Sequence, residues 1–244
     1  MRAVIVSDIH GNLAALHAVL DDAARLGYDA LWCLGDLVGY GPQPNECVAL
    51  IQARAARCLA GNHDLGVLGA VPLDDFNAYA AAANRWTAGV LLPEARAYLA
   101  TLTPRQDFAG VTLAHGSPRE PVWEYVVSPS IAAASFAAFA GDVCFVGHSH
   151  LPLVCREPPG GEPPRLLAGR AGQRVPLPGR CIVNPGSVGQ PRDGDPRAAY
   201  AIYEDAPAPT IEFRRVAYDV AATQALMRQA GLPAYLIERL AHGR

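Results

Sequence analysis

Short apolar runs alternate with helical patterns through the first 150 residues. Such runs, apolar at consecutive positions, are typical of strands that are buried on both faces. They predict strands at Ala3–Val6, Ala30–Leu34, Cys58–Ala60, Val111–Ala114 and Val143–Val146.

The segments between these runs have the spacing of amphipathic helices. Asn12 is a suitable helix cap, and the apolar residues Leu13, Leu16, Leu20 and Ala23 that follow it repeat with the helical period. Further helices are expected at Gln43–Arg54, over residues 75–102, which are rich in Ala, and at Ser130–Ala140. Strands that alternate with helices predict an α/β fold with a largely parallel sheet.

The second half of the chain has a different pattern. Residues 157–180 are dense in Pro and Gly, which predicts an irregular hairpin or an exposed insertion. Strands then follow without intervening helices, so we expect a second, more antiparallel sheet; they are Cys181–Val183, Ala199–Glu204 and Thr210–Val216. Two helices, Asp219–Gly231 and Pro233–His242, end the chain. No linker is evident, and residues 1–244 are expected to form a single domain.

Composition narrows the class of protein. A chain of 244 residues, 51% hydrophobic and 18% charged, can bury a core without disulfides. Its net charge of −3 and its isoelectric point near 6.1 argue against nucleic acid polymers and acidic membranes as partners. No apolar run approaches the roughly 18 residues of a membrane span, and residues 1–8 resemble a strand more than a secretory signal. We therefore expect a cytoplasmic protein.

Two further features of the composition bear on chemistry. Lys is absent from the chain, which excludes a P-loop lysine and Schiff-base catalysis. No two cysteines have a C-x-x-C spacing, and most lie in apolar runs, so we expect buried free thiols in a reducing compartment. The six cysteines are Cys33, Cys47, Cys58, Cys144, Cys155 and Cys181.

Polar residues follow directly after each strand predicted in the first half. Because ligands bind outside the carboxyl ends of strands in α/β sheets, these side chains are expected to form one site. Five of the seven histidines belong to the group, whereas His17 and His242 lie in predicted helices and are interpreted as ordinary surface residues. The group consists of Asp8, His10, Asp36, Asn62, His63, His115, His148 and His150.

The residue types in this group indicate metal chemistry. Even without His63, three carboxylate or amide groups and four imidazoles are too many for one tetrahedral zinc ion. They suit two divalent ions of higher coordination, such as Mn, Fe, Zn, Ni or Co. Two such ions bridged by a carboxylate, about 3.5–4 Å apart, form the arrangement used for displacement at phosphorus.

The order of these blocks resembles the calcineurin-like metallophosphoesterase superfamily. The blocks are Asp8-x-His10, Gly35-Asp36, Gly61-Asn62-His63-Asp64, His115 and Gly147-His148-x-His150. The later segment Asn184-Pro-Gly-Ser187 is similar to one common in the smaller prokaryotic members. The resemblance implies a four-layer αββα sandwich, with two mixed sheets packed between helices.

The resemblance also implies roles for the residues. One metal ion would take Asp8, His10, Asp36 and His150, and the other would take Asp36, Asn62, His115 and His148. Asp36 would bridge the ions together with a hydroxide that attacks phosphorus in line with the leaving oxygen. His63 would bind the phosphate and protonate the leaving group. Asp64 would orient a neighbouring group, or would only cap the turn before Leu65.

Weaker candidates follow the motifs along the chain. Tyr40, Arg119 and Arg192 each come shortly after a ligand-bearing turn and are candidates for substrate binding. The protein Ser/Thr phosphatases of the superfamily carry Asp-Arg-Gly after the second block, where this chain has Leu-Val-Gly-Tyr-Gly after Asp36. This difference disfavours a phosphoprotein substrate.

These observations predict a dinuclear-metal phosphoesterase that hydrolyses small phosphate monoesters, diesters or dinucleoside polyphosphates. A first alternative is a non-catalytic scaffold of the same fold that binds partner proteins, but the complete set of ligand residues and His63 favours catalysis. A second alternative is a nuclease, which the absence of Lys and the acidic isoelectric point disfavour. The identity of the metal ions, the substrate and the formation of a homodimer stay open.

Overall fold

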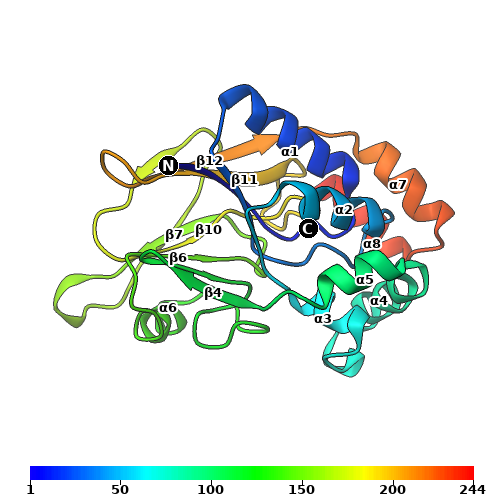
Figure 1. The fold of residues 1–244 in the computed structure, drawn as a ribbon, viewed down its shortest axis with the longest axis horizontal. Coiled ribbons are helices and arrows are strands. Elements are labelled where there is room, and N and C mark those ends of the chain that lie inside the picture. Colours follow the sequence, from blue (N-terminus) through cyan, green and yellow to red (C-terminus); the bar gives the residue numbers. More distant parts are fainter.

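The computed structural model describes residues 1–244, except that the burial of Gly161 is left out. Within it, strands form two six-stranded sheets that face each other (Figure 1). The first sheet has the order β3 (Arg57–Cys58), β2 (Ala30–Cys33), β1 (Arg2–Val6), β11 (Ala198–Glu204), β12 (Thr210–Val216) and β9 (Arg174–Pro176). The second has the order β4 (Arg105–Phe108), β5 (Val111–Ala114), β6 (Val143–Val146), β10 (Cys181–Asn184), β7 (Leu153–Arg156) and β8 (Leu166–Ala168).

Helices cover the outer faces of the sheets. In Figure 1, α1 lies along the first sheet and α6 lies beneath the second, which confirms the predicted four layers. The helices are α1 (Leu13–Leu26), α2 (Pro44–Arg54), α3 (Asn62–Leu68), α4 (Ala78–Val90), α5 (Pro93–Leu99), α6 (Pro129–Phe136), α7 (Val220–Gln229) and α8 (Ala234–Arg239). Short 3-10 turns are η1 (Leu73–Asp75), η2 (Pro159–Gly161) and η3 (Leu240–His242).

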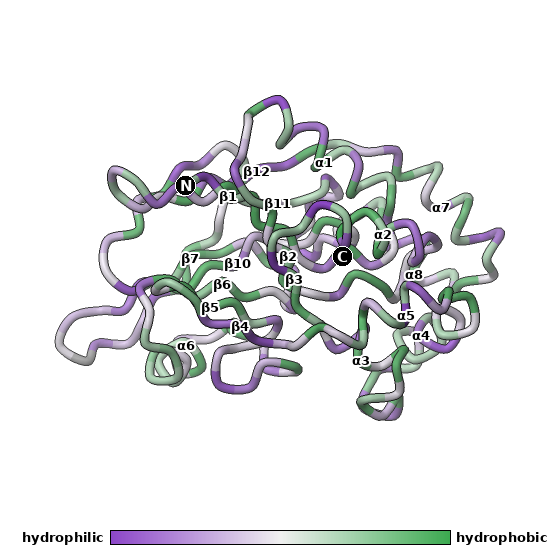
Figure 2. The backbone as a smooth tube through the Cα atoms, viewed as in Figure 1, coloured by the Kyte–Doolittle hydropathy of each residue, from purple (hydrophilic) through white to green (hydrophobic). Residues whose placement is uncertain are grey.

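The strand β1 shows why its sequence is apolar at consecutive positions. Ala3 and Ile5 pack between the two sheets, whereas Val4 and Val6 pack against the helices on the outer face. Successive side chains of a strand point to opposite faces, so a strand in the middle of four layers is buried on both. Figure 2 shows the same arrangement, with hydrophobic residues along the strands and hydrophilic residues concentrated in the peripheral loops.

The division of the sheets differs from the expectation. We expected first-half strands in one sheet and second-half strands in another, and this prediction is wrong. β1 pairs with β2 in parallel and with β11 antiparallel, whereas β10 pairs with β6 in parallel and with β7 antiparallel. Each sheet is therefore mixed and contains strands from both halves of the chain.

The predicted helix cap at Asn12 agrees with the structure, whereas two predicted segments differ from it in part. Asn12 caps α1 through its side-chain oxygen, which accepts a hydrogen bond from the Ala15 N–H group. The helix expected over residues 75–102 is instead divided into α4 and α5, because Pro93 cannot continue the helix that precedes it. The segment 157–180 is not wholly irregular, since it adds the edge strand β8 to one sheet and β9 to the other.

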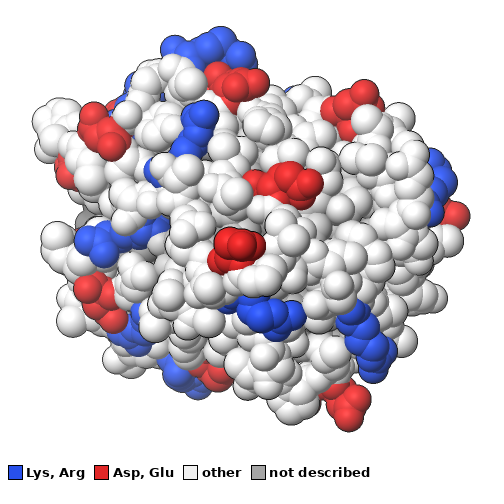
Figure 3. Space-filling view, turned by 45° about the vertical axis from the view of Figure 1, so that its right-hand side comes forward, with Lys and Arg blue, Asp and Glu red and all other residues white. Residues whose placement is uncertain are grey.

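Three predictions from composition concern the cysteines, the surface charge and membrane-spanning helices. All six cysteines are buried and free, as expected. On the face shown in Figure 3, acidic and basic side chains are interspersed and do not gather into a basic patch. None of the helices that the structure describes has both the length and the apolarity needed to cross a lipid bilayer.

Candidate active site

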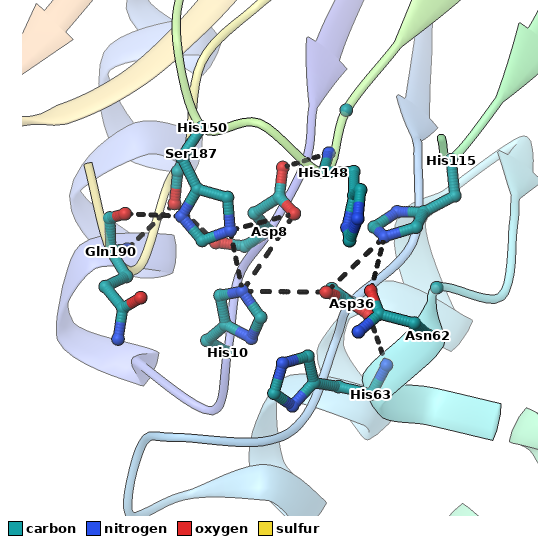
Figure 4. Close-up of polar contacts among 12 residues, drawn as sticks. Asp8, His10, Asp36, Asn62, His63, His115, His148, His150, Ser187 and Gln190 are labelled. Atoms are coloured by element: carbon teal, nitrogen blue, oxygen red, sulfur yellow. Dashed lines mark hydrogen bonds and ion pairs between the residues drawn. The ribbon is translucent and has the colours of Figure 1, made fainter. Parts of the chain in front are cut away.

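The polar residues predicted to form a site come together where strands of both sheets end. β1, β2 and β3 of the first sheet lead to the three segments that begin with Asp8, Asp36 and Asn62. β5 and β6 of the second sheet lead to the two segments that begin with His115 and His148. All of these side chains are buried and point toward a common centre (Figure 4). The group comprises Asp8, His10, Asp36, Asn62, His63, His115, His148 and His150.

The backbone is unusual at this edge of the sheets. Five of these residues have a positive φ, between 51° and 61°, which side-chain-bearing residues rarely adopt. Such conformations cost roughly 1–3 kcal/mol each and persist where the surrounding structure holds them. They turn the chain sharply after β1, β2 and β6, so that these strand ends present their side chains to one centre. The five are Asp8, His10, Asp36, His148 and His150.

The side chains form two clusters that Asp36 connects. In the first cluster, His150 Nε2 lies 3.3 Å from Asp8 Oδ1 and 3.2 Å from His10 Nε2. In the second, His115 Nε2 lies 3.0 Å from Asn62 Oδ1 and 3.5 Å from Asp36 Oδ2. Asp36 Oδ2 also lies 3.7 Å from His10 Nε2, so one carboxylate oxygen contacts both clusters.

Backbone carbonyl groups hold the imidazole rings in place. The Nδ1 atoms of His10, His115 and His150 donate to the carbonyl oxygens of Val38, Leu34 and Gln190. His148 uses the other nitrogen, Nε2, which donates to the Trp123 carbonyl oxygen. A carbonyl oxygen only accepts, so the remaining nitrogen of each ring presents a lone pair to the centre. This is the arrangement in which histidines bind metal ions.

The electrostatics of the cluster also fit cations. Burial lowers the pKa of His10, His115, His148 and His150, which keeps these rings neutral and able to bind metal. Burial and the nearby Asp64 and Asp8 carboxyl groups raise the pKa of Asp36 well above its usual range. Asp8 Oδ1 is buried and has no hydrogen-bond partner among the residues described. Facing lone pairs and an unpaired carboxylate oxygen are the donors that divalent ions require.

His63 lies beside the two clusters at the first turn of α3. Its backbone N–H group donates to Asp36 Oδ1 at 2.8 Å, and its side-chain Nδ1 lies 2.8 Å from Asn84 Oδ1. Its ring packs against Tyr40 and Phe76. Burial lowers the pKa of His63 to about 3. The ring is thus neutral in the free protein, and its Nε2 is the nitrogen left for the adjoining pocket.

The Asp64 carboxylate accepts hydrogen bonds from backbone N–H groups and not from a ligand side chain. Its Oδ1 accepts hydrogen bonds from the N–H groups of Leu37 and Val38, at 3.0 and 3.2 Å. Its Oδ2 accepts from Gly61 N–H at 2.9 Å, which caps α3. Asp64 therefore connects the loop that carries Asp36 to the turn that carries Asn62.

A pocket of about 170 Å³ opens onto the clusters. Its floor contains Asp36, Asn62, His63, His148 and His150. Half of its wall residues are aromatic, and Tyr125 stacks on the His148 ring with a centroid distance of 4.0 Å. The wall residues are Tyr40, Asp75, Phe76, Asn77, Ala80, Trp123, Tyr125 and Arg192.

The three weaker candidates differ in their positions. Tyr40 and Arg192 line the pocket, and the Arg192 guanidinium lies 5.9 Å from the centroid of the Tyr40 ring. Arg119 is not among the pocket residues; its guanidinium is half exposed and pairs with Glu124. The structure therefore brings Tyr40 and Arg192 to the site and leaves Arg119 outside it.

Sequence reasoning missed several residues at the site. Trp123, Tyr125 and Phe76 follow no strand directly, so no local pattern marks them. The segment Asn184–Ser187, at the end of β10, has a structural role that the family resemblance did not predict. Asn184 Nδ2 donates to the Gly147 carbonyl oxygen at 2.7 Å, and Ser187 Oγ donates to the Asp8 carbonyl oxygen at 2.8 Å. This segment therefore holds the loops that carry the ligands.

The chain belongs to the calcineurin-like phosphoesterase superfamily, whose domain description matches residues 1–205. It is a hydrolase that acts on phosphoric esters. The solved structure of a metallophosphoesterase from Sphaerobacter thermophilus is 46% identical, has a TM-score of 0.90, and covers 100% of this chain and 99% of its own. An uncharacterised protein of Methanocaldococcus jannaschii is 41% identical over 98% of this chain and 97% of its own length.

A more limited similarity concerns an enzyme with a stated substrate. The symmetrical bis(5'-nucleosyl)-tetraphosphatase of Psychromonas ingrahamii is 39% identical over 71 residues, which are 28% of this chain and 26% of that enzyme. The matched part is thus about a quarter of either protein.

Proposed function

We propose that this chain hydrolyses P–O bonds in small phosphate monoesters, diesters or dinucleoside polyphosphates, using two divalent metal ions. The observation that carries the proposal is the position of Asp36. Its Oδ2 atom lies 3.7 Å from His10 Nε2 and 3.5 Å from His115 Nε2, between two clusters of buried donors. A carboxylate in this position can bind one ion from each cluster.

The donors divide naturally between the two ions. Asp8, His10 and His150 would hold the first, and Asn62, His115 and His148 would hold the second, with Asp36 shared. Ions of Mn, Fe, Zn, Ni or Co would supply Lewis acidity toward the phosphoryl oxygens and hydroxide at neutral pH. The residues themselves hold the donors rigid, because four of the rings are fixed by backbone carbonyl groups.

His63 is the group proposed to handle the leaving oxygen. Its Nδ1 is engaged by Asn84, so Nε2 is free to meet a phosphate in the pocket. Nε2 carries a hydrogen only when the ring is charged, and burial disfavours that form in the free protein. A bound anionic phosphate favours the charged ring, so the ring would take up its proton with the substrate and pass it to the leaving oxygen.

The pocket walls favour an ester with a flat organic group. Tyr40, Phe76, Trp123 and Tyr125 offer ring faces and edges next to the phosphate site. Arg192 lines the pocket and donates through Nε and Nη2 to the neutral Gln190 Oε1, so its positive charge is not paired with a carboxylate among the described residues and its Nη1 can bind a second anionic group. Nucleotide esters combine these properties, and the partial similarity to a tetraphosphatase supports them as substrates.

Residues 1–244 are proposed to act as one domain, because the C-terminal helices pack against Tyr40 and α4 at the edge of the pocket. A cytoplasmic location is supported by six buried free thiols. No described residue favours the scaffold alternative, which is an outcome of the following test.

The test combines metal analysis with a panel of esters. The purified protein is loaded with Mn, Fe, Zn, Ni or Co and assayed on nitrophenyl phosphate, bis-nitrophenyl phosphate and diadenosine tetraphosphate. We expect turnover with at least one metal, and its loss in Asp36→Asn. Asp74→Asn, at an exposed position of η1, is the matched control. Folded, metal-loaded protein that turns over none of these esters would favour the scaffold alternative.

A further inference from the structure

The residue that contacts the His63 ring nitrogen lies in a helix outside the ligand-bearing segments. Asn84 lies in α4, and its side chain is fully buried. Its Oδ1 lies 2.8 Å from His63 Nδ1. An amide oxygen only accepts, so the hydrogen of the neutral imidazole resides on Nδ1 and the lone pair on Nε2.

Two glycines leave the space in which these side chains meet. A Cβ atom at Gly39 would lie 2.4 Å from His63 Nδ1 and 3.0 Å from Asn84 Oδ1, and Gly39 has a φ of +83°. A Cβ atom at Gly66 would lie 3.0 Å from Asn84 Nδ2. Any side chain at Gly39 would therefore displace the contact, and one at Gly66 would crowd the amide.

The Asn84 amide is buried although, in the described part of the chain, only its oxygen has a hydrogen-bond partner. Asn84 Nδ2 is buried and has no hydrogen-bond partner among the residues described. An unsatisfied buried polar group is unfavourable, and such groups in native structures usually have a functional reason. A leucine would fill the same space without an unpaired donor, so the amide is explained by what its oxygen does for His63.

A neutral acceptor also suits the surroundings. Asp8, Asp36 and Asp64 already place three carboxyl groups in the buried site. An amide orients the ring of His63 without adding a fourth. The oxygen of Asn84 thus sets both the plane of the ring and the nitrogen that faces the pocket.

We propose that Asn84 is a positioning residue that holds His63 with Nδ1 protonated and Nε2 directed at the phosphate site. Its kinetic consequence rests on the proposed phosphoesterase function, whereas the state of the ring does not. A displacement of about 1 Å at a reacting group can reduce the rate ~100-fold, so loss of the acceptor is expected to be costly.

The first test reads the ring directly and needs no activity. In the metal-free protein, the imidazole ¹⁵N resonances of His63, assigned with His63→Gln, should show hydrogen on Nδ1. Asn84→Leu should convert the signal to a mixture or to hydrogen on Nε2, whereas Asn84→Asp, which keeps an acceptor, should retain Nδ1–H. Hydrogen on Nε2 in the wild-type protein, or an unchanged signal in Asn84→Leu, would overturn the proposal.

The second test is a double-mutant cycle on an alkyl phosphate ester. Asn84→Leu should lower kcat/KM by about 10–100-fold in the wild-type background and have no further effect when His63 is Ala. Thr87→Val, a fully buried position one turn along α4, is the matched control and should leave kcat/KM unchanged. Equal losses in both backgrounds would show that Asn84 acts only on the fold and would overturn the proposal. If Asn84→Leu does not unfold cooperatively, Asn84→Asp decides: loss of its Nδ1–H signal overturns the proposal, and retention supports it.

Discussion

The Nε2 atoms of His10 and His150 lie 3.2 Å apart, although the Nδ1 atom of each ring already donates to a backbone carbonyl oxygen. Both Nε2 atoms therefore present lone pairs to each other. Burial lowers the pKa of both rings, which disfavours a proton between them. A divalent cation bound by both nitrogens and by Asp8 removes this repulsion, and its effects can be measured.

Removal of metal should destabilise the fold. Ions held at 100 times their dissociation constant stabilise the folded state by about 2.7 kcal/mol per site. With two such sites in a chain of this size, chelation is expected to lower Tm by about 10–20 °C in a calorimetric scan. Asp8→Asn should show a smaller difference between metal-loaded and chelated samples. An identical Tm with and without chelator would contradict metal binding at these clusters.

Single substitutions should separate the two clusters. His150→Ala removes a donor of the first cluster only, and His115→Ala removes one of the second only. Each should lower the bound metal by about half, as measured by elemental analysis, since each ion uses about half of the donors. Asp36→Asn should impair both sites because its carboxylate is shared. The exposed His17→Ala is the control, and total loss of metal in both histidine variants would contradict the division of ligands.

Two arginines provide a matched test of the substrate pocket. Arg192 lines the pocket, whereas Arg119 pairs with Glu124 outside it. A hydrogen bond from a guanidinium to an anion contributes about 1.5–3 kcal/mol, so Arg192→Ala should raise KM by roughly 10–100-fold with a smaller change in kcat. Arg119→Ala should leave both constants near those of the wild type. Steady-state kinetics on the best substrate of the panel distinguish these outcomes, and equal behaviour of the two variants would exclude Arg192 from substrate binding.

His63 should matter most for poor leaving groups. An alkoxide needs a proton on departure, whereas a nitrophenolate is stable without one. His63→Ala is therefore expected to retain its metal and to lose ~10²–10⁴-fold in kcat on an alkyl or nucleotide ester, with a clearly smaller loss on nitrophenyl phosphate. Equal losses on both esters would mean that His63 only holds the phosphate. Loss of metal would instead identify it as a ligand.

Acid should destabilise the metal-free protein through His63. Its pKa is about 3 in the folded state against an ordinary value of 6.5, so the unfolded chain binds one more proton between these limits. The free energy of unfolding should thus fall by about 1.4 kcal/mol per pH unit below 6.5 for this residue. Urea unfolding between pH 4.5 and 6 should show a shallower dependence in His63→Gln by about that amount. Parallel curves would show that the ring is not buried and neutral.

The local sequence accounts for much of this protein. The runs Val111–Ala114 and Val143–Val146 and the cap at Asn12 lie where their patterns predict, because strand apolarity and helix capping depend on neighbouring residues. The clusters of Asp, Asn and His after the strands were visible for the same reason. Each follows its strand directly, so the position of one predicts the position of the other.

Contacts between distant segments account for the rest. The pairing of β1 with β11 and of β10 with β6 could not be inferred, because strand partners are chosen by packing across the whole chain. The sequence shows Asn84 only as a polar residue in an Ala-rich helix, and its contact with His63 depends on how α4 packs against α3. Arg119 and Arg192 look equivalent along the chain, but in the fold Arg119 pairs with Glu124 outside the pocket, whereas Arg192 lines it. A side chain's role at this site depends on which neighbours desolvate and pair it, and many of those neighbours are far away in the sequence, as Asp8 is from His150.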